Sequence, residues 1–267
     1  MSALIVDSHC HLDRGPLNKE LDAVIARAGQ AGVGLMVTIG TQLETFPRTL
    51  AVAQAHANVY ATVGTHPHHA EAERDQVSCE RLLELAAHPK VAGIGEAGLD
   101  YFYDRSERAV QREVFRRHIA AARKSGLPLV IHTRAAEEDT AEILREEMQK
   151  GGFSFVMHCF SSAPWLAELA VELGGYVSFS GILTFKKSDE VRAAAAAVPL
   201  ERLLVETDSP FLAPVPHRGK PCEPAYTALT LQKLADIKGL ERDEMARITT
   251  DNFLRLFARV PDPRKAA

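Results

Sequence analysis

The sequence predicts an α/β protein that folds as a single (β/α)8 TIM barrel with an extra C-terminal helix. Short apolar runs alternate with amphipathic segments along the whole chain. Strands that alternate with helices pair in parallel, and eight such units favour a closed barrel over an open sheet. The length of 267 residues is typical of one such barrel, and no linker or second domain interrupts the pattern. We therefore expect one domain over residues 1–267.

The expected elements end at recognisable signals. Gly126 ends a helix over Ser106–Ser125, as glycine commonly does. His118 lies in the apolar stripe of this helix, so we expect it to pack in the core. Two closing helices are expected over Ala225–Ile237 and Glu241–Arg259. The eight expected strands are Leu4–Asp7, Leu35–Ile39, Val59–Val63, Val91–Ile94, Leu129–Ile131, Phe153–Met157, Tyr176–Phe179 and Leu203–Glu206.

Composition narrows the class of protein. The net charge of −4 argues against broad, sequence-blind coating of nucleic acid, which needs a basic surface. No apolar run approaches the roughly 20 residues that span a bilayer, and no secretory signal precedes the first strand. The cysteines at 10, 79, 159 and 222 form no Cys-x-x-Cys pair, which is typical of a reducing compartment. We expect a cytoplasmic protein with no membrane contact, and no obligate protein partner is readable.

Metal-ligand side chains recur where the expected strands end. Side chains alternate faces along a strand, so His9 and His11 point the same way and Cys10 points the opposite way. Imidazole is a ligand for Zn, Ni, Fe and Cu. In a barrel the carboxyl ends of all strands meet at one rim, where sites are built. We therefore expect one shared site, and its six side chains are His9, His11, Glu96, His132, His158 and Asp208.

Six such side chains are too many for one catalytic ion that keeps a position open, and they suit two ions sharing a carboxylate. Strand four lies between the other groups around the ring, so Glu96 is the expected bridge. One ion would be held by His9, His11, Glu96 and Asp208, and the other by Glu96, His132 and His158. Such ion pairs lower the pKa of a bridging water and clamp the attacking and leaving oxygens. We expect Asp208 to act as the general base. Glu96, as the bridging carboxylate, is the second expected catalytic residue.

Several strings carry a resemblance to a known family. They are DSHCHLD, GTHPHHA, GEAGLDYFYD, IHTR, HCFSS and ETDSPFLAPVPHRGKPCEPAY. The chain resembles, over nearly its whole length, the TatD family of metal-dependent deoxyribonucleases, which are amidohydrolase-type TIM barrels. The resemblance implies a two-metal site on the same six residues and magnesium-dependent hydrolysis of DNA from its 3′ end. Some amidohydrolase barrels bridge their metals with a carboxylated lysine on strand five. Here His132 follows Ile131 instead, so bridging falls to Glu96.

The loops that follow the strands supply the expected substrate contacts. The family motif singles out His66, while His68 is equally well read as a loop histidine held by backbone contacts. Cationic side chains give local positive charge for phosphate, although the lysine pair also fits a solvated turn. They are Arg134, Lys186, Lys187, Arg218 and Lys220. We expect one or two of the nearby aromatic rings to stack on a base. These rings are Tyr101, Phe102, Tyr103, Phe160, Trp165, Phe185 and Phe211.

Four small side chains beside the motifs are not expected to be ligands. Cys10 and Cys159 each follow a ligand histidine, and we interpret both as buried apolar groups that face away from the site. Ser162 and Cys222 replace the glycine and asparagine that the family often has. Both fall in loops near the expected mouth, so they bear on substrate preference rather than on metal binding.

Three functions remain open at this stage. The leading one is a two-metal deoxyribonuclease acting on single-stranded or frayed DNA ends. The same ligands also suit hydrolysis of an amide or ester, such as a D-aminoacyl-tRNA. A metal-binding scaffold without turnover is a third. Four imidazoles favour Zn or Mn, while the resemblance favours Mg, so the sequence predicts two divalent ions without fixing their identity.

Overall fold

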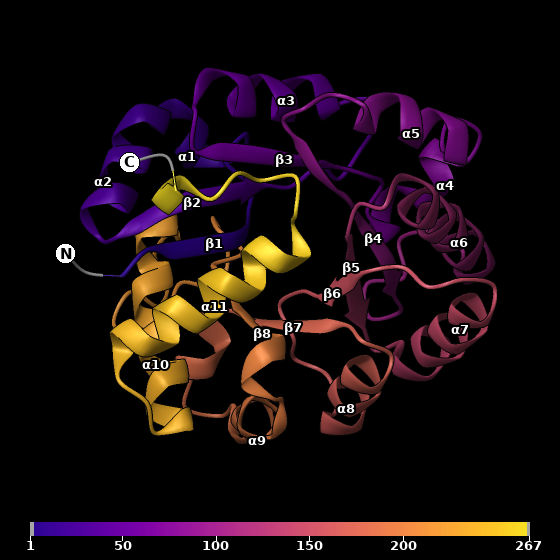
Figure 1. Ribbon diagram of the computed structural model, residues 1–267. Helices are drawn as coiled ribbons and strands as arrows, with labels where there is room; N and C mark the ends of the chain where they lie inside the picture. The colour runs from indigo at the N-terminus through magenta and orange to yellow at the C-terminus, as the bar shows by residue number, and fades with distance from the viewer. Residues whose placement is uncertain (1–2, 266–267) are drawn as a thin grey trace.

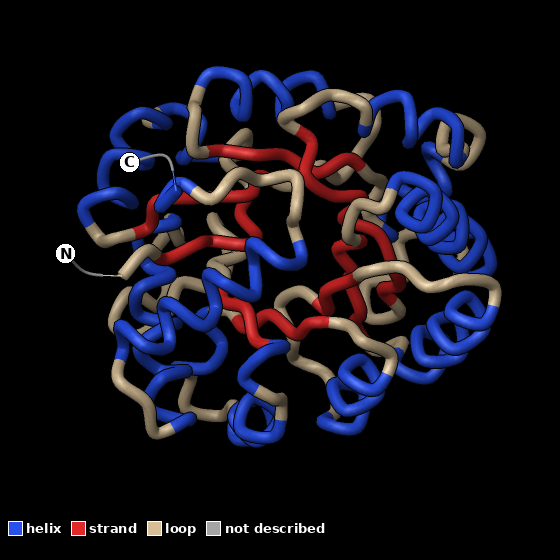
Figure 2. Tube along the Cα trace, in the orientation of Figure 1, coloured by secondary structure: helices blue, strands red, loops and turns tan. Residues whose placement is uncertain are grey.

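A computed structural model describes residues 3–265, so residues 1–2 and 266–267 of the predicted domain lie outside it. Eight parallel strands follow one another around the sheet in chain order. Helices surround this ring of strands (Figures 1 and 2). The predicted (β/α)8 barrel is confirmed. The strands are β1 (Ile5–Cys10), β2 (Val33–Thr38), β3 (Val59–Val63), β4 (Val91–Asp100), β5 (Leu129–Arg134), β6 (Phe155–Met157), β7 (Tyr176–Phe179) and β8 (Leu203–Val205).

The helices lie near their predicted positions, and they form a layer around the strands. The predicted helix over 106–125 is α6, which begins at Arg108 and ends where Gly126 adopts a φ of 71°. The two closing helices are α10 (Thr227–Lys238) and α11 (Arg242–Leu256). The others are α1 (Gly15–Lys19), α2 (Leu21–Gln30), α3 (Phe46–Ala55), α4 (Ala70–Glu73), α5 (Cys79–Ala86), α7 (Glu137–Gln149), α8 (Pro164–Glu172) and α9 (Asp189–Ala197). Among residues 3–265, no helix is long and apolar enough to cross a membrane.

The barrel closes between its first and last strands. The backbone N–H of Asp208 donates to the carbonyl of His9 at 2.9 Å, and that of His11 donates to the carbonyl of Ser209 at 2.7 Å. Asp7 ties the same seam from within, because its carboxylate accepts both the N–H and the hydroxyl of Thr207. The closure therefore lies directly beside three of the predicted metal ligands.

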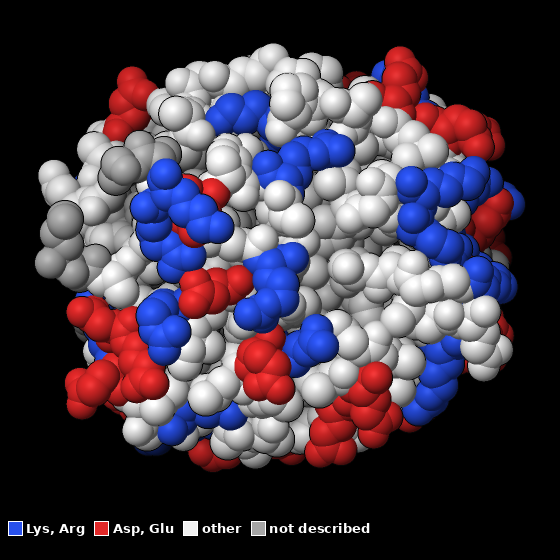
Figure 3. Space-filling model, in the orientation of Figure 1, with Lys and Arg blue, Asp and Glu red and all other residues white. Residues whose placement is uncertain are grey.

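Helix α11 covers the amino-terminal end of the barrel (Figure 1). Its buried Phe253 and the adjoining Phe257 pack with Val6, Ala92 and Val130 in an apolar cluster inside the strands. The larger core lies between the strands and the outer helices. Because this end is filled and covered, a site in the barrel can be reached only from the carboxyl ends of its strands, where sites of such barrels are built. On the covered face, cationic and anionic side chains are interspersed (Figure 3).

Strand β4 is longer than the sequence predicts. The expected end at Ile94 is wrong, because the strand continues to Asp100 through a register shift against β5 between Ile94 and Ala97. Glycines make this close packing feasible. Gly98 has a φ of 147°, and a Cβ there would lie 2.0 Å from the carbonyl oxygen of His132. The irregularity places Glu96 inside the strand rather than after it.

Candidate metal centre

The six predicted ligands converge at the open end of the barrel. Strand β1 carries His9 and His11, whose Nε2 atoms lie 3.6 and 3.4 Å from Oδ1 of Asp208. Glu96 comes from β4 and His132 from β5, while His158 follows β6. The ring of His158 stacks on that of His9 with centroids 3.9 Å apart. The structure therefore brings together all six residues, including His9 and Asp208, which are far apart in the sequence.

The carboxylate of Glu96 lies between two groups of ligands. Its Oε2 is 3.5 Å from Nε2 of His9, on the side of β1 and Asp208. Its Oε1 is 3.0 Å from Nδ1 of His132 and 2.8 Å from Nε2 of His158. One oxygen thus faces each predicted ion position, which is the arrangement that a bridging carboxylate requires.

Two buried carboxylates set which nitrogen of each histidine faces the centre. Nε2 of His132 donates to Asp100 at 3.1 Å, and Nδ1 of His158 donates to Glu206 at 3.2 Å. Burial acts to lower the pKa of His158 and of His132, but the carboxylates around them outweigh it and raise both values, so each ring can also carry a proton on the nitrogen that faces Glu96. A bound cation would take the place of that proton, since a neutral imidazole keeps one N–H and one lone pair. Such partners orient metal-binding histidines and raise their basicity. Neither Asp100 nor Glu206 is predicted from the sequence, although both lie within the GLD and ETD strings that mark the site.

The donor set fits divalent cations. His132 Nδ1 and His158 Nε2 are 3.4 Å apart and face the same carboxylate oxygen, so the positive charge that stabilises this group comes either from protons on the rings or from a bound cation. Within the described residues, Nε2 of His9 and Nδ1 of both His9 and His11 are buried without a hydrogen-bond partner. Two of the three groups with metal-binding spacing are His9–His11–Glu96 and His9–His158–Glu206.

The third such group contains His66, but its hydrogen bonding indicates a different role. His66, Glu96 and His132 lie within metal-binding distance of one another. Nδ1 of His66 accepts the backbone N–H of His68 at 3.1 Å, so the ring proton sits on Nε2. Burial lowers the pKa of His66 to about 3, which keeps the ring neutral. Its Nε2–H, 3.4 Å from Oε1 of Glu96, is therefore a donor rather than a ligand.

The electrostatics of the centre favour ionised carboxylates. Burial acts to raise the pKa of Glu96, but the charge of His158 and the hydrogen bonds from His132 and His158 outweigh it and hold this pKa well below its usual range. The pKa of Asp208 is also lowered, because its contact with His11 and the nearby His9 outweigh burial. Asp208 is also the more exposed of the two, with 15% of its side chain accessible against 4% for Glu96.

His118 packs in the core as predicted and anchors the loop that carries His66. Its Nδ1 donates to the carbonyl of Val114 at 2.8 Å, and its Nε2 accepts the backbone N–H of Thr65 at 3.0 Å. The hydroxyl of Thr65 also donates to the buried Glu73. The residue before His66 is therefore fixed from two sides.

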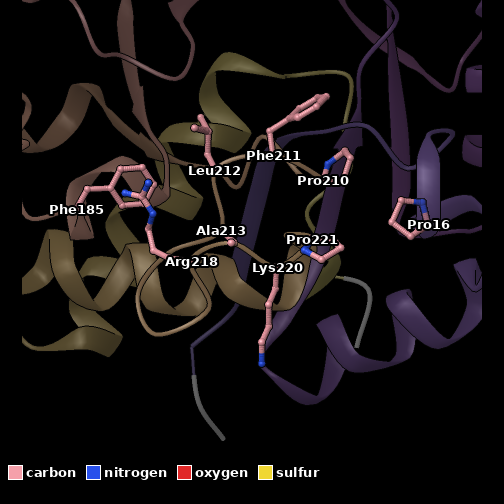
Figure 4. A pocket seen from close by; sticks show the side chains of 10 residues that line it. Pro16, Phe185, Pro210, Phe211, Leu212, Ala213, Arg218, Lys220 and Pro221 are labelled. Atoms are coloured by element: carbon pink, nitrogen blue, oxygen red, sulfur yellow. The ribbon is translucent and has the colours of Figure 1, made fainter.

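Two of the predicted substrate cations line a groove that reaches the metal centre through Phe211. This groove of about 530 Å³ has Phe185 and Arg218 at one end and Pro16 at the other (Figure 4). The guanidinium of Arg218 lies 3.6 Å from the ring centroid of Phe185. Phe211 lines the same groove, with its ring centroid 6.0 Å from that of His11. Lys220 also lines it, with its side chain directed away from Phe211 (Figure 4).

The predictions for the small side chains meet with mixed outcomes. Cys10 is fully buried, and its thiol contacts the carbonyl of Val37, as expected for a group facing away from the site. Cys159 is only partly buried, has a φ of 44°, and contacts Ser180, so the expectation of a buried apolar group is wrong there. Ser162 and Cys222 are both buried, with Cys222 fully inaccessible, so neither side chain is open to the mouth.

Fold and site together define a class of enzyme, a metal-dependent hydrolase on a TIM barrel. Comparison with known proteins places the chain more narrowly. Residues 6–258 match the sequence profile of the family described as TatD related DNase, and the chain belongs to this family.

Relatives with similar sequences span nearly the whole chain. The chain is 43% identical over 258 residues to the uncharacterized metal-dependent hydrolase YcfH of Escherichia coli K12, covering 95% of each. It is 38% identical over 256 residues to YabD of Bacillus subtilis, also described as an uncharacterized metal-dependent hydrolase, covering 95% of this chain and 99% of that one. The crystal structure of the TatD homologue YjjV of Escherichia coli superposes with a TM-score of 0.86 at 31% identity, covering 96% and 98%. The prediction of a metal-dependent hydrolase of the TatD family is confirmed.

Proposed function

We propose that this hydrolase is a deoxyribonuclease that removes nucleotides from the 3′ end of single-stranded or frayed DNA. The observation that carries the proposal is the Glu96 ligand cluster, which lies at a mouth whose loops present unpaired positive charge. A phosphodiester needs both features, because its backbone is anionic at every residue. The family to which the chain belongs supports the same reading.

The five cationic side chains predicted to contact substrate form no ion pair with a carboxylate in the described part of the chain. Among the described residues, no carboxylate oxygen lies within 4.0 Å of the charged nitrogens of these side chains, which are Arg134, Lys186, Lys187, Arg218 and Lys220. Many arginines on the outer helices are paired, as Arg116 is with Glu146 and Glu147. Local positive charge is therefore available for phosphate although the chain carries a net charge of −4.

Two divalent ions would be held by the six converging residues. His9, His11 and Asp208 would hold one, His132 and His158 the other, and Glu96 would bridge them. Bound ions of this kind supply Lewis acidity, which activates water and offsets the charge of phosphate oxygens. Their identity among Mg, Mn and Zn is a matter for metal analysis of the purified protein.

The protein's own groups have distinct proposed roles. Asp208, ionised and partly exposed, would accept the proton of the attacking water. The neutral His66 would donate its Nε2–H to a phosphate oxygen. Arg218 and Lys220 on one side of the mouth and Arg134 on the other would position the flanking phosphates.

An end-labelled assay tests the proposal. Purified protein with Mg²⁺ or Mn²⁺ should release nucleotides from single-stranded DNA, and a blocked 3′ end should stop release while a blocked 5′ end should not. His132→Ala and Glu96→Gln should abolish the activity, whereas His56→Ala, outside the centre, should leave it unchanged. Activity indifferent to the first two changes indicates a contaminating nuclease and overturns the assignment.

Two further arms separate the roles and the substrates. His66→Ala should slow cleavage but keep the full metal content, because its proton makes Nε2 a donor, while His132→Ala should lose metal as well. A parallel assay on D-aminoacyl-tRNA tests the alternative reaction, since the same ligands suit ester hydrolysis. Release of the amino acid without any DNA cleavage would replace the proposed function.

A further inference from the structure

The structure offers a second recognition element on the side of the mouth opposite the groove. It consists of Phe102 and Tyr103, which follow β4, and Arg134 at the end of β5. We call these three residues the aromatic platform. In a ring of eight strands, β4 lies across the barrel from β8, whose loop forms the groove beside Phe211. The centre therefore lies between the platform and the groove.

The rings of the platform are exposed although they are large and apolar. Phe102 is 61% exposed and Tyr103 is 48% exposed, and within the described residues only Phe211 and Val215 are comparable large apolar side chains. All four lie in loops that follow β4 or β8. Exposed apolar area gathered at one end of a protein marks a binding surface.

The platform is held rigidly and is coupled to the centre. Oδ1 of Asp100 accepts the backbone N–H groups of Phe102 and Tyr103 at 3.1 and 2.9 Å. Oδ2 of the same carboxylate accepts His132, a predicted metal ligand, at 3.1 Å, and His68 at 2.9 Å. One buried side chain thus fixes both the rings and a ligand histidine. The platform's position relative to the centre is therefore set by the fold.

The guanidinium of Arg134 lies over both rings and keeps its charge available. Its Cζ is 4.2 Å from the ring centroid of Phe102 and 4.7 Å from that of Tyr103. No side-chain hydrogen bond or ion pair within residues 3–265 occupies its donors. The two rings are nearly perpendicular, with centroids 5.0 Å apart and an interplanar angle of 89°, so each presents a face of its own. An exposed ring face beside an unpaired planar cation matches a nucleotide, which combines a flat base with an anionic phosphate.

We propose that the platform binds one nucleobase of the DNA strand, stacked on the ring of Phe102 and flanked by the edge of Tyr103, with Arg134 on its phosphate. This inference rests on the proposed deoxyribonuclease function and adds a site that orients the strand across the mouth. Base stacking on an aromatic side chain corresponds to about 5-fold to about 150-fold in affinity. Because the platform lies beside the centre, the base it holds belongs to a nucleotide near the cleaved bond.

Abasic substrates test the platform directly. Single-stranded oligonucleotides would carry one abasic residue at successive positions from the cleaved bond, and KM and kcat would be measured for each. For the wild type, one abasic position should raise KM by at least about 5-fold. In Phe102→Ala the KM for intact DNA should rise similarly, and the abasic residue at that position should add nothing further. Phe102→Trp should restore the wild-type pattern, since it keeps a ring.

Charge and shape are separated by a second pair of variants. Arg134→Lys keeps the charge but loses the plane, so it should weaken binding less than Arg134→Gln, with a difference that shrinks as salt is raised. Arg247→Lys, whose guanidinium is paired with Asp251 on α11 at the opposite end of the barrel, is the matched control and should behave as the wild type. Unchanged melting temperatures would show that the exposed substitutions leave the fold intact.

The outcomes distinguish the platform from the enzyme activity. If the wild type cleaves DNA and one abasic residue raises KM by the same factor in the wild type and in Phe102→Ala, the platform does not bind the base. The proposed deoxyribonuclease function would still stand. Absence of DNA cleavage by the wild type overturns the proposed function. In that case, fluorescence anisotropy with the same oligonucleotides still tests whether the platform binds a base. An affinity that is the same for intact and abasic DNA, and the same for wild type and Phe102→Ala, would contradict the proposal.

Discussion

At the scale of single residues, the centre depends on which ring nitrogen of each histidine carries the proton. Asp100 and Glu206 hold the protons of His132 and His158 on the nitrogens that face away from Glu96. His9 and His11 have no such partner in the described part of the chain. The two predicted ion positions therefore differ in how far their ligands are oriented before an ion binds.

Removing the charge of either carboxylate should weaken metal binding. Asp100→Asn and Glu206→Gln should each lower metal affinity about 10-fold to about 100-fold, because the ligand histidine loses basicity and orientation. Isothermal titration of the chelated protein with Mn²⁺ or Zn²⁺ measures this. Asp139→Asn, which removes a carboxylate bonded to Tyr101 outside the centre, should keep wild-type affinity. Equal affinities in all variants would show that the carboxylates only support the fold.

His118 gives the protein a predicted sensitivity to acid. Burial lowers the pKa of His118 to about 4, whereas the unfolded chain has the ordinary value of about 6.5. The unfolded state therefore binds the proton first, so the contribution of His118 is complete above about pH 6.5 and is lost as the pH falls towards about 4. The loss amounts to about 3 kcal/mol in total.

Denaturant unfolding of His118→Gln at several pH values checks this expectation. The glutamine can still accept the N–H of Thr65 but does not titrate, so stability should fall less steeply between pH 6.5 and 4 than in the wild type. Both proteins should be measured with a chelator, because acid also releases metal. Parallel pH profiles would mean that His118 titrates normally in the folded protein.

At the scale of elements, α11 packs against the strands at the end of the barrel opposite the metal centre. Phe257, just after the helix, is fully buried and stacks on Phe253 with centroids 4.7 Å apart. A Cβ at Gly93 of β4 would lie 3.2 Å from the Phe257 ring, which shows how closely the two meet. The helix therefore supports the strands without approaching the mouth.

Phe257→Ala should destabilise the fold and spare the chemistry. Truncating a buried phenylalanine leaves a cavity and costs about 3–5 kcal/mol of the free energy of unfolding. Metal affinity and kcat should stay within about twofold of wild type at low temperature. Leu254→Ala, on a partly buried position of the same helix, should cost less. Denaturant unfolding paired with metal titration measures both effects, and a large loss of metal affinity would show that α11 is coupled to the centre.

At the scale of the whole molecule, the ligands come from segments that meet only in the closed barrel. Divalent ions should therefore bind the folded chain far better than the unfolded chain. At a free metal concentration 100 times the dissociation constant, binding should stabilise the protein by about 2.7 kcal/mol. The melting temperature should fall with a chelator and recover when metal is restored, and Glu96→Gln should lose most of the recovery. A melting temperature that ignores metal would contradict the centre.

Much of this organisation could be predicted from the sequence, because it depends on periodicity and on chain order. Apolar runs indicate the strands, and the barrel brings their carboxyl ends together, so His132 and Asp208 could be assigned to one site. The position of Glu96 within β4 could not, because the glycines around it hide the strand pattern and permit the register shift. The proton positions of His66 and His158 also escape the sequence, since they depend on hydrogen bonds such as that to Glu206.

The seam of the barrel has a consequence for synthesis of the protein. Asp208 meets His9 through a backbone hydrogen bond, so the first and last ligands of the centre are joined by the step that completes the ring. While the ribosome has not yet released residue 208, the growing chain can present only part of this constellation. A hydrolase of this design is therefore without its full set of ligands until Asp208 has been synthesised and released, and it gains them only when its final strand docks.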